Sequence, residues 1–161
     1  MLHDSVGLKG YLKVFRKFQS ASGTLGRELH FEGDNLIVNS GKAIFLLSLY
    51  TSSVDQSLKY AKVGTGGATD AGGIYLKTPT PSMTDLYNPV AVIPMTKSHQ
   101  NLAVPSITLT ASLDNADGNG LSINEAGFFA GTDAMFNIKT FPKIDKTYDF
   151  SIDLEWTISV V

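Results

Sequence analysis

The segment Tyr148–Val161 alternates strictly between apolar and polar side chains. Apolar residues occupy every second position from Tyr148 to Val160, with Trp156 among them, and polar residues fill the positions between. Because successive side chains of a β-strand point to opposite faces, this pattern predicts a long strand with one buried and one solvated face. A buried face of this length needs an apolar partner layer, which is either a second sheet or another subunit.

Shorter segments of the same kind recur through the chain, separated by Gly, Pro and other turn-forming residues. We expect further strands at Leu8–Phe18, Leu25–Phe31, Tyr60–Val63, Asn88–Thr96, Ser106–Leu113, Leu121–Phe129 and Phe136–Phe141. Turn-forming residues predict a β-hairpin within 8–32 and a second one that joins Ser106–Leu113 to Leu121 through residues 114–120. The predicted fold class is mainly β, a single antiparallel β-sandwich domain over residues 1–161.

One segment has the pattern of a helix rather than of a strand. Ser40 is a favourable N-cap, and apolar residues then surround most of the helical wheel: Ala43, Ile44, Phe45, Leu46, Leu47, Leu49 and Tyr50. We therefore expect one short helix, at about residues 41–51, that is buried on most sides and covers an end or an open edge of the sandwich.

Residues 67–88 are rich in Gly, Thr, Pro and Ser and show no periodicity. A segment of this length without periodicity is uncommon inside a compact domain and is usually functional or ordered by a partner, so we expect a long irregular arm. Two rings of the first strand, Tyr11 and Phe15, lie among lysines and add to this predicted contact surface. The candidate interface residues are Tyr11, Phe15, Tyr75, Thr78, Pro79, Pro81, Met83, Leu86 and Tyr87.

Charge and composition narrow the possible partners. The chain has 13 Lys and Arg against 15 Asp and Glu, a net charge of -2, which argues against nucleic-acid binding. No apolar run reaches the length of a membrane span or a signal peptide, so we expect no membrane partner. The chain has 0 cysteines, which excludes disulfides and thiolate metal sites. We expect a protein kept in the cytosol or exported only as part of an assembly.

The loop 115–120 resembles the first half of a calcium-binding loop. Asn115, Asp117 and Asn119 place oxygen side chains at alternate positions, with Gly120 at the sharp turn. The position that should hold a bidentate acid is Ala126, however, and the same residues are common in hairpin turns. We favour the turn and expect no metal and no cofactor.

The glycine-rich segment 64–67 follows a strand, as a phosphate-binding loop does, but no Lys-Ser or Lys-Thr follows it. The three histidines, His3, His30 and His99, are far apart in the sequence. They leave a catalytic triad formally open, although solvated surface histidines are the simpler interpretation.

Two sets of carboxylates also invite a catalytic interpretation. Asp149, Asp153 and Glu155 share one face of the last strand, where they could serve a glycosidase but more often prevent edge pairing. Glu125 falls in phase with Leu121 and Ile123, so it is predicted to point inward. A buried carboxylate needs backbone amides or a lysine as partners, and an internal anchor is favoured over a catalytic role. We expect no enzyme.

The order of several short motifs resembles that of small structural proteins of tailed-bacteriophage virions, which are associated with the tail, baseplate or tail fibre. These motifs are NLIVNSG (35–41), YAKVGTG (60–66), INEAGFF (123–129), TFPKIDKT (140–147) and LEWTI (154–158). The resemblance covers residues 35–161 and implies a β-sandwich that contacts other virion proteins, with no catalytic residues. The chain departs from it at 67–88, where a shorter connection is expected.

The resemblance leads to a specific functional expectation. We expect a virion structural protein of the tail, neck or baseplate, assembled in the host cytoplasm as a homo-oligomer. A capsid decoration (cement) protein is the alternative within that class. A carbohydrate-binding module for host attachment is an alternative from another class, with Tyr11, Phe15, Tyr75 and Tyr87 as its candidate platforms. A small hydrolase that uses Glu125 is the weakest alternative.

Overall fold

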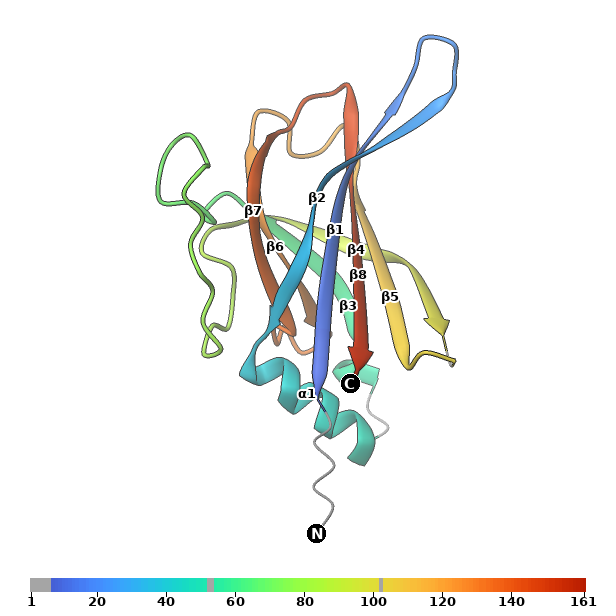
Figure 1. The fold of residues 1–161 in the computed structure, drawn as a ribbon, viewed down its shortest axis with the longest axis vertical. Helices are drawn as coiled ribbons and strands as arrows, with labels where there is room; N and C mark the ends of the chain where they lie inside the picture. Colours follow the sequence, from blue (N-terminus) through green and yellow to red (C-terminus); the bar gives the residue numbers. More distant parts are fainter. Residues whose placement is uncertain (1–6, 52–53, 102) are drawn as a thin grey trace.

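The computed structural model describes residues 7–51, 54–101 and 103–161, which form a closed antiparallel β-barrel with one α-helix at its end (Figure 1). The elements in chain order are β1 (Leu8–Gln19), β2 (Leu25–Ile37), α1 (Asn39–Tyr50), the 3-10 turn η1 (Val54–Gln56), β3 (Leu58–Gly64), β4 (Pro89–Asn101), β5 (Ser106–Leu113), β6 (Ser122–Ala130), β7 (Asn137–Asp145) and β8 (Phe150–Val160).

The predicted β-sandwich is wrong because the sheet closes on itself. Its strand order is β1-β2-β7-β6-β3-β4-β5-β8, and β8 pairs with β5 on one side and with β1 on the other. The junction between β2 and β7 rests on two residue pairs, Leu36 with Ile138 and Ile37 with Asn137. Alternation gives each strand one buried face in a sandwich and in a barrel alike, so it could not distinguish the two.

The predicted hairpin between Ser106–Leu113 and Leu121 is also wrong. β5 pairs with β4 and β8, whereas β6 pairs with β3 and β7. The connection 114–120 is long enough to pass across an end of the barrel, so it does not force its two strands to be neighbours. The predicted β1–β2 hairpin is confirmed, and its far part extends beyond the end of the barrel opposite α1 (Figure 1).

The apolar face of β8 lines the barrel interior, as the alternation predicts. Trp156 is fully buried and meets the Phe128 ring edge to face, with the ring centroids 4.5 Å apart. Ile152 and Leu154 are fully buried in the same core. Each such side chain contributes roughly 1.5–3 kcal/mol through burial.

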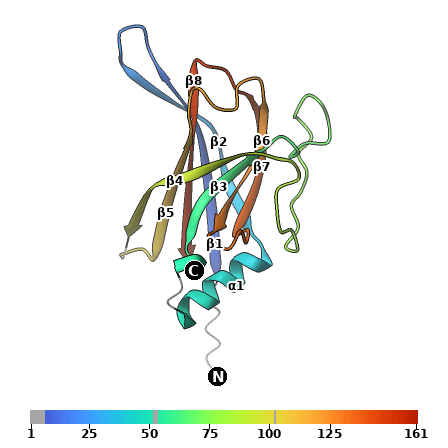
Figure 2. The same ribbon diagram turned by 180° about the vertical axis from the view of Figure 1, so that it is seen from behind.

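Helix α1 crosses one end of the barrel (Figure 2), but it is not the buried helix that the sequence predicts. Only Gly41 and Ile44 of this helix are buried. A Cβ atom at Gly41 would lie 2.0 Å from the Phe136 carbonyl oxygen, so glycine permits the close approach of α1 to the barrel. Ser40 is inside the helix and donates to the Met135 carbonyl oxygen at 2.6 Å instead of capping it. Because apolar residues lie on nearly all sides of α1, the sequence does not indicate which side contacts the barrel.

Candidate functional site

The side chain of Glu125 on β6 anchors the loop 65–88 to the barrel. It is fully buried, and its carboxylate accepts hydrogen bonds from three backbone amides of this loop. Gly66 and Asn88 donate to Oε1 at 2.9 and 2.8 Å, and Tyr87 donates to Oε2 at 2.9 Å. Of the two kinds of partner that the sequence left open for a buried Glu125, backbone amides or a lysine, the amides bind it.

The predicted inward direction of Glu125 is wrong. The pairing of β6 with β7 shifts register between Ile123 and Glu125. Such an irregularity reverses the alternation beyond it, so Ile123 and Phe128 lie in the main core while Glu125 lies beneath the loop outside the barrel wall. The apolar positions of the sequence change phase here, from 121 and 123 to 126, 128 and 130, but the prediction extended the first phase to Glu125.

The glycine-rich segment 64–67 binds an anion that belongs to the chain itself. Gly66 donates to the Glu125 carboxylate, and Gly67 donates to the Asn124 Oδ1 atom at 2.7 Å. A Cβ atom at Gly64 would lie 2.4 Å from the Glu125 Oε1 atom. Glycine is therefore required for the close approach of backbone and carboxylate, and this explains the resemblance to a phosphate-binding loop.

The second half of the loop also packs against the outside of the barrel. Leu86 is buried in a second apolar cluster with Phe129 and Ile138, and Met83 packs against the same cluster. Within the loop, the amide of Thr69 donates to the Tyr75 carbonyl oxygen at 2.8 Å. Residues 65–88 are therefore built into the fold along much of their length.

This packing divides the predicted interface residues. Met83 and Leu86 face the barrel, and Phe15 lies beneath the Arg27 guanidinium at 3.6 Å, so these three contribute little to a free surface. Tyr11 and Pro79 are partly buried. The exposed candidates are Thr78, Pro81, Tyr87 and Tyr75, of which Tyr75 is 70% exposed.

A charged network that the sequence did not indicate joins the loop to the turn after β6. The Lys62 ammonium lies 3.1 Å from Asp85 and 3.2 Å from Asp133, and it rests 4.2 Å from the centre of the Phe129 ring. The Tyr60 hydroxyl donates to Asp133. Burial, followed by this hydrogen bond, raises the pKa of Tyr60 to about 12. One ammonium thus lies between two carboxylates, and the Tyr60 hydroxyl gives Asp133 a second partner, so the network ties the loop to the turn after β6.

The loop 115–120, which resembles the first half of a calcium-binding loop, surrounds a side chain of the protein. Lys146 is 1% exposed, and its ammonium donates to the Asn115 carbonyl oxygen at 3.2 Å, to Asn119 Oδ1 at 3.2 Å and to the Thr147 carbonyl oxygen at 2.7 Å. Burial lowers the pKa of Lys146. Asp117 remains exposed, and the described residues contain no group of three or more His, Asp or Glu that could hold a metal ion.

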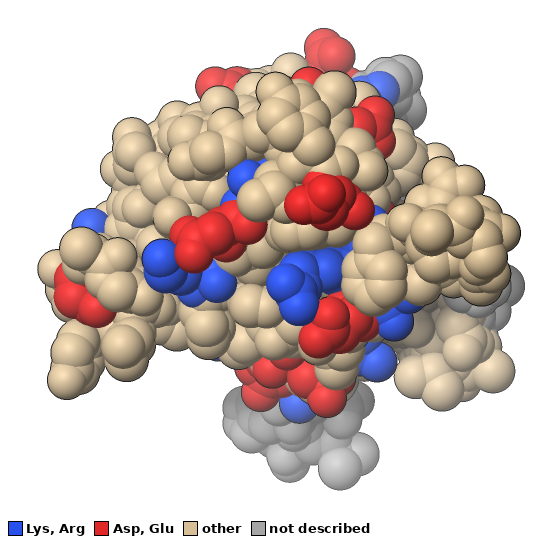
Figure 3. All heavy atoms as spheres, turned by 90° about the horizontal axis from the view of Figure 1, so that it is seen from above, with Lys and Arg blue, Asp and Glu red and all other residues tan. Residues whose placement is uncertain are grey.

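The carboxylates of β8 are paired rather than free. Asp153 accepts a hydrogen bond from the Ser112 hydroxyl at 2.6 Å, and Glu155 pairs with Arg27 at 2.6 Å. Asp149 is exposed and accepts a hydrogen bond from Thr147. Figure 3 shows cationic and anionic side chains interleaved on the end opposite α1, with no continuous patch of either sign on that face.

The three histidines do not form a described site. The His30 Nε2 atom lies 2.8 Å from the Pro142 carbonyl oxygen, on the hairpin side of the barrel. His3 and the side chain of His99 lie outside the described residues. Nothing in the described structure therefore joins His30 to the Ser and Asp groups of a triad.

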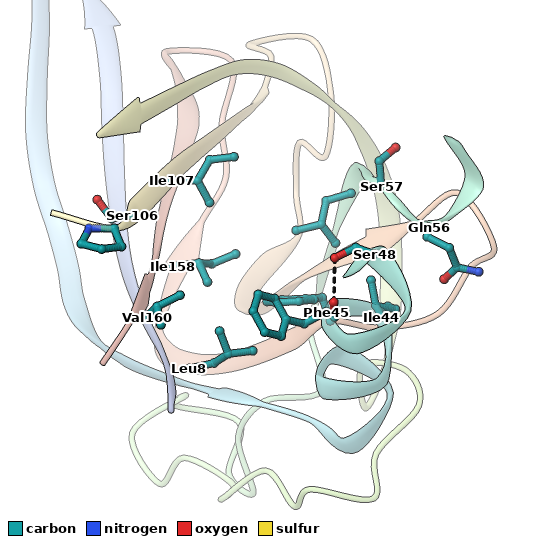
Figure 4. A pocket seen from close by; sticks show the side chains of 13 residues that line it. Leu8, Ile44, Phe45, Ser48, Gln56, Ser57, Ser106, Ile107, Ile158 and Val160 are labelled. Atoms are coloured by element: carbon teal, nitrogen blue, oxygen red, sulfur yellow. Dashed lines mark hydrogen bonds between the residues drawn. The ribbon is translucent and has the colours of Figure 1, made fainter. Parts of the chain in front are cut away.

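The helix end of the barrel contains an apolar pocket of about 300 Å³ (Figure 4). Its wall includes Leu8 of β1, Ile44 and Phe45 of α1, Ile107 of β5 and Ile158 of β8. Ser48 also lines the pocket, but its hydroxyl donates to the Phe45 carbonyl oxygen at 2.6 Å. This lining suits an apolar group and offers no titratable side chain for catalysis.

The outer face of α1 is an exposed apolar surface at the helix end of the barrel. It consists of Leu46, Leu47, Leu49 and Tyr50, which are 64%, 41%, 74% and 88% exposed. A second hollow lies beside it, lined by Gly7, Leu8, Lys42, Phe45, Leu46 and Leu49. Contiguous apolar surface of this kind marks an interaction site more often than a solvated face. The sequence predicted the helix but not this exposure.

Comparison of the chain with protein-family models, curated proteins and solved structures gave no significant match. Among the described residues, no helix combines the length and the apolar character needed to cross a membrane. The function is therefore inferred from the residues and geometry of this chain.

Proposed function

We propose that this chain is a structural protein of a tailed-bacteriophage virion, a tail, neck or baseplate component that acts through contacts with other virion proteins and with its own copies. The observation that carries the proposal is the apolar outer face of α1, formed by Leu46, Leu47, Leu49 and Tyr50. Exposing these side chains to water is unfavourable, and a protein partner that covers them removes that cost.

The buried charged groups support a contact role over catalysis. Glu125 is held by three loop amides, Lys146 by three oxygen atoms, and Asp153 by Ser112. A catalytic acid or base has to face a space that a substrate can enter, whereas Glu125 and Lys146 face the chain itself. Asp153 lines a surface hollow, but there it accepts a hydrogen bond from Ser112 and lies 3.8 Å from Arg27. The hydrogen bonds of these groups therefore stabilise the fold of the chain.

Three of the motifs that resemble virion proteins lie at contacts that hold the loop 65–88 and the helix α1 to the barrel. The segment 60–66 provides Gly64 and Gly66, and the segment 123–129 provides the Glu125 that binds between them. The segment 35–41 ends at Gly41, where α1 touches the barrel. A shared framework with different exposed surfaces is consistent with proteins that differ in their assembly partners.

The test is to locate the chain in assembled particles. Purified particles, labelled with an antibody against the chain and imaged by electron microscopy, should show the label at the tail, neck or baseplate. A label distributed over the capsid at high copy number would favour a decoration protein instead. Particles without the chain would overturn the proposal, and glycan-array binding by the purified protein would then favour the carbohydrate-binding alternative.

A further inference from the structure

One stripe of α1 lies on the exposed side of the helix, beside the hollow that Gly7 and Leu8 also line. Lys42, Leu46, Leu49 and Tyr50 are at i, i+4, i+7 and i+8, so they share one side of the helix. All four are exposed, whereas Ile44, on the opposite side of the wheel, is buried.

The apolar part of this face is large enough to form the centre of an interface. Leu46, Leu47, Leu49 and Tyr50 are 64%, 41%, 74% and 88% exposed. At roughly 150 to 250 Å² for a large side chain, they present on the order of 500 Å² of apolar surface. A stable interface buries about 800 Å² on each partner, with an apolar centre and a polar rim. The outer face of α1 therefore supplies much of the apolar area that a stable dimer interface buries on each partner.

The charge on α1 favours a second copy as the partner. Lys42 is the one charged residue in its sequence, and the last turn of the helix has no basic side chain to offset the partial negative charge of the helix end. Lys42 and Tyr50 are equally distant from Leu46 in sequence. Antiparallel helices that cross at Leu46 therefore place each Lys42 beside the negative end of the other helix.

We propose that α1 is a two-fold interface, in which it packs antiparallel against α1 of a second copy with Leu46 on the axis. The hollow lined by Leu8, Lys42, Phe45, Leu46 and Leu49 then receives Tyr50 of the partner subunit. This inference rests on the proposed function, because it assigns the surface through which the copies associate.

Cross-linking tests the position of the axis directly. The chain has 0 cysteines, so a single introduced cysteine can react only with its counterpart in another copy. Leu46→Cys should form a disulfide-linked dimer under mild oxidation, at least roughly tenfold faster than a random encounter allows. Leu25→Cys is the matched control, because Leu25 is 67% exposed on the β1–β2 hairpin. Equal rates for the two variants would overturn the proposal.

Sedimentation of the full chain gives an independent readout. The native protein should sediment as a dimer, and Leu46→Glu, which places two carboxylates together on the axis, should sediment as a folded monomer. Leu25→Glu should remain dimeric. A monomeric native chain that is nevertheless found in particles would overturn the two-fold contact and leave the proposed function standing. A dimeric chain that is absent from particles would support the contact and contradict the proposed function.

Discussion

The loop 65–88 and the helix α1 lie on the same barrel and differ in what fixes them. The loop is irregular, yet Glu125 holds three of its amides and Leu86 packs into an apolar cluster beneath it. The helix satisfies its own backbone, yet it buries only Gly41 and Ile44 and leaves a row of leucines in solvent. Regular secondary structure and burial are thus separate properties in this protein.

In the loop 65–88, the Glu125 side chain accepts the backbone hydrogen bonds that a neighbouring strand would otherwise accept. A loop that cannot pair its amides with a neighbouring strand needs another acceptor, and a buried carboxylate supplies several at once. A helix has no such need, so its outer face is free to present apolar side chains to a partner. The loop is therefore fixed within the chain, whereas the helix is suited to contacts between chains.

The largest expected effect comes from removing the anchor of the loop. Glu125→Ala leaves the amides of Gly66, Tyr87 and Asn88 without their acceptor in a buried position. We expect the free energy of unfolding to fall by about 4 kcal/mol, as measured by urea denaturation. Glu28→Ala is the matched control, since Glu28 forms an exposed ion pair with Arg16, and it should cost less than about 1 kcal/mol. Equal losses for the two variants would contradict the role of Glu125.

Two truncations on α1 distinguish its buried side from its exposed side. Ile44→Ala should lower the free energy of unfolding by about 3 kcal/mol because Ile44 is buried against the barrel. Leu49→Ala should lower it by less than about 0.5 kcal/mol because Leu49 faces solvent within the single chain. Both are measured in the Leu46→Glu background, so that self-association does not contribute. A large loss for Leu49→Ala would mean that this face packs within the chain.

The smallest effect concerns the hydroxyl of Tyr60. Burial and the hydrogen bond to Asp133 raise its pKa from 10.0 to about 12, so the folded state favours the neutral form. This contribution to stability is complete below pH 10.0 and is lost as the pH rises from 10.0 to about 12. Burial also raises the pKa of Tyr11 and Tyr87. An absorbance titration of the native protein should therefore show a late tyrosine step that loses one tyrosine in Tyr60→Phe and is unchanged in Tyr148→Phe. A titration without the late step would contradict the network.

The sequence predicts those features that depend on local pattern. The alternation at Tyr148–Val161 identifies β8 and its buried Trp156. The cost of burying a charge predicts that Glu125 has a partner, although it left backbone amides and a lysine as alternatives. Strand pairing depends on contacts between distant segments, so the closure of the barrel through Ile37 and Asn137 left no local signal.

The candidate site was harder to predict for a related reason. The apolar wheel of α1 concealed that Ile44 faces the barrel while Leu46 faces solvent. The ammonium in the loop 115–120 comes from Lys146, which is distant in sequence, and the partners of Glu125 come from both ends of the loop. A single sequence does not record which of these segments meet.

Hydrogen exchange of the native protein at two concentrations tests most directly whether the loop 65–88 is held within the chain while α1 contacts another copy. We predict that the amides of Gly66, Tyr87 and Asn88 exchange slowly, with the same protection at low and high concentration, because their acceptor is in the same chain. The protection of α1 should rise with concentration as its outer face becomes covered. Rapid exchange of the three loop amides, together with an α1 that is insensitive to concentration, would contradict the account.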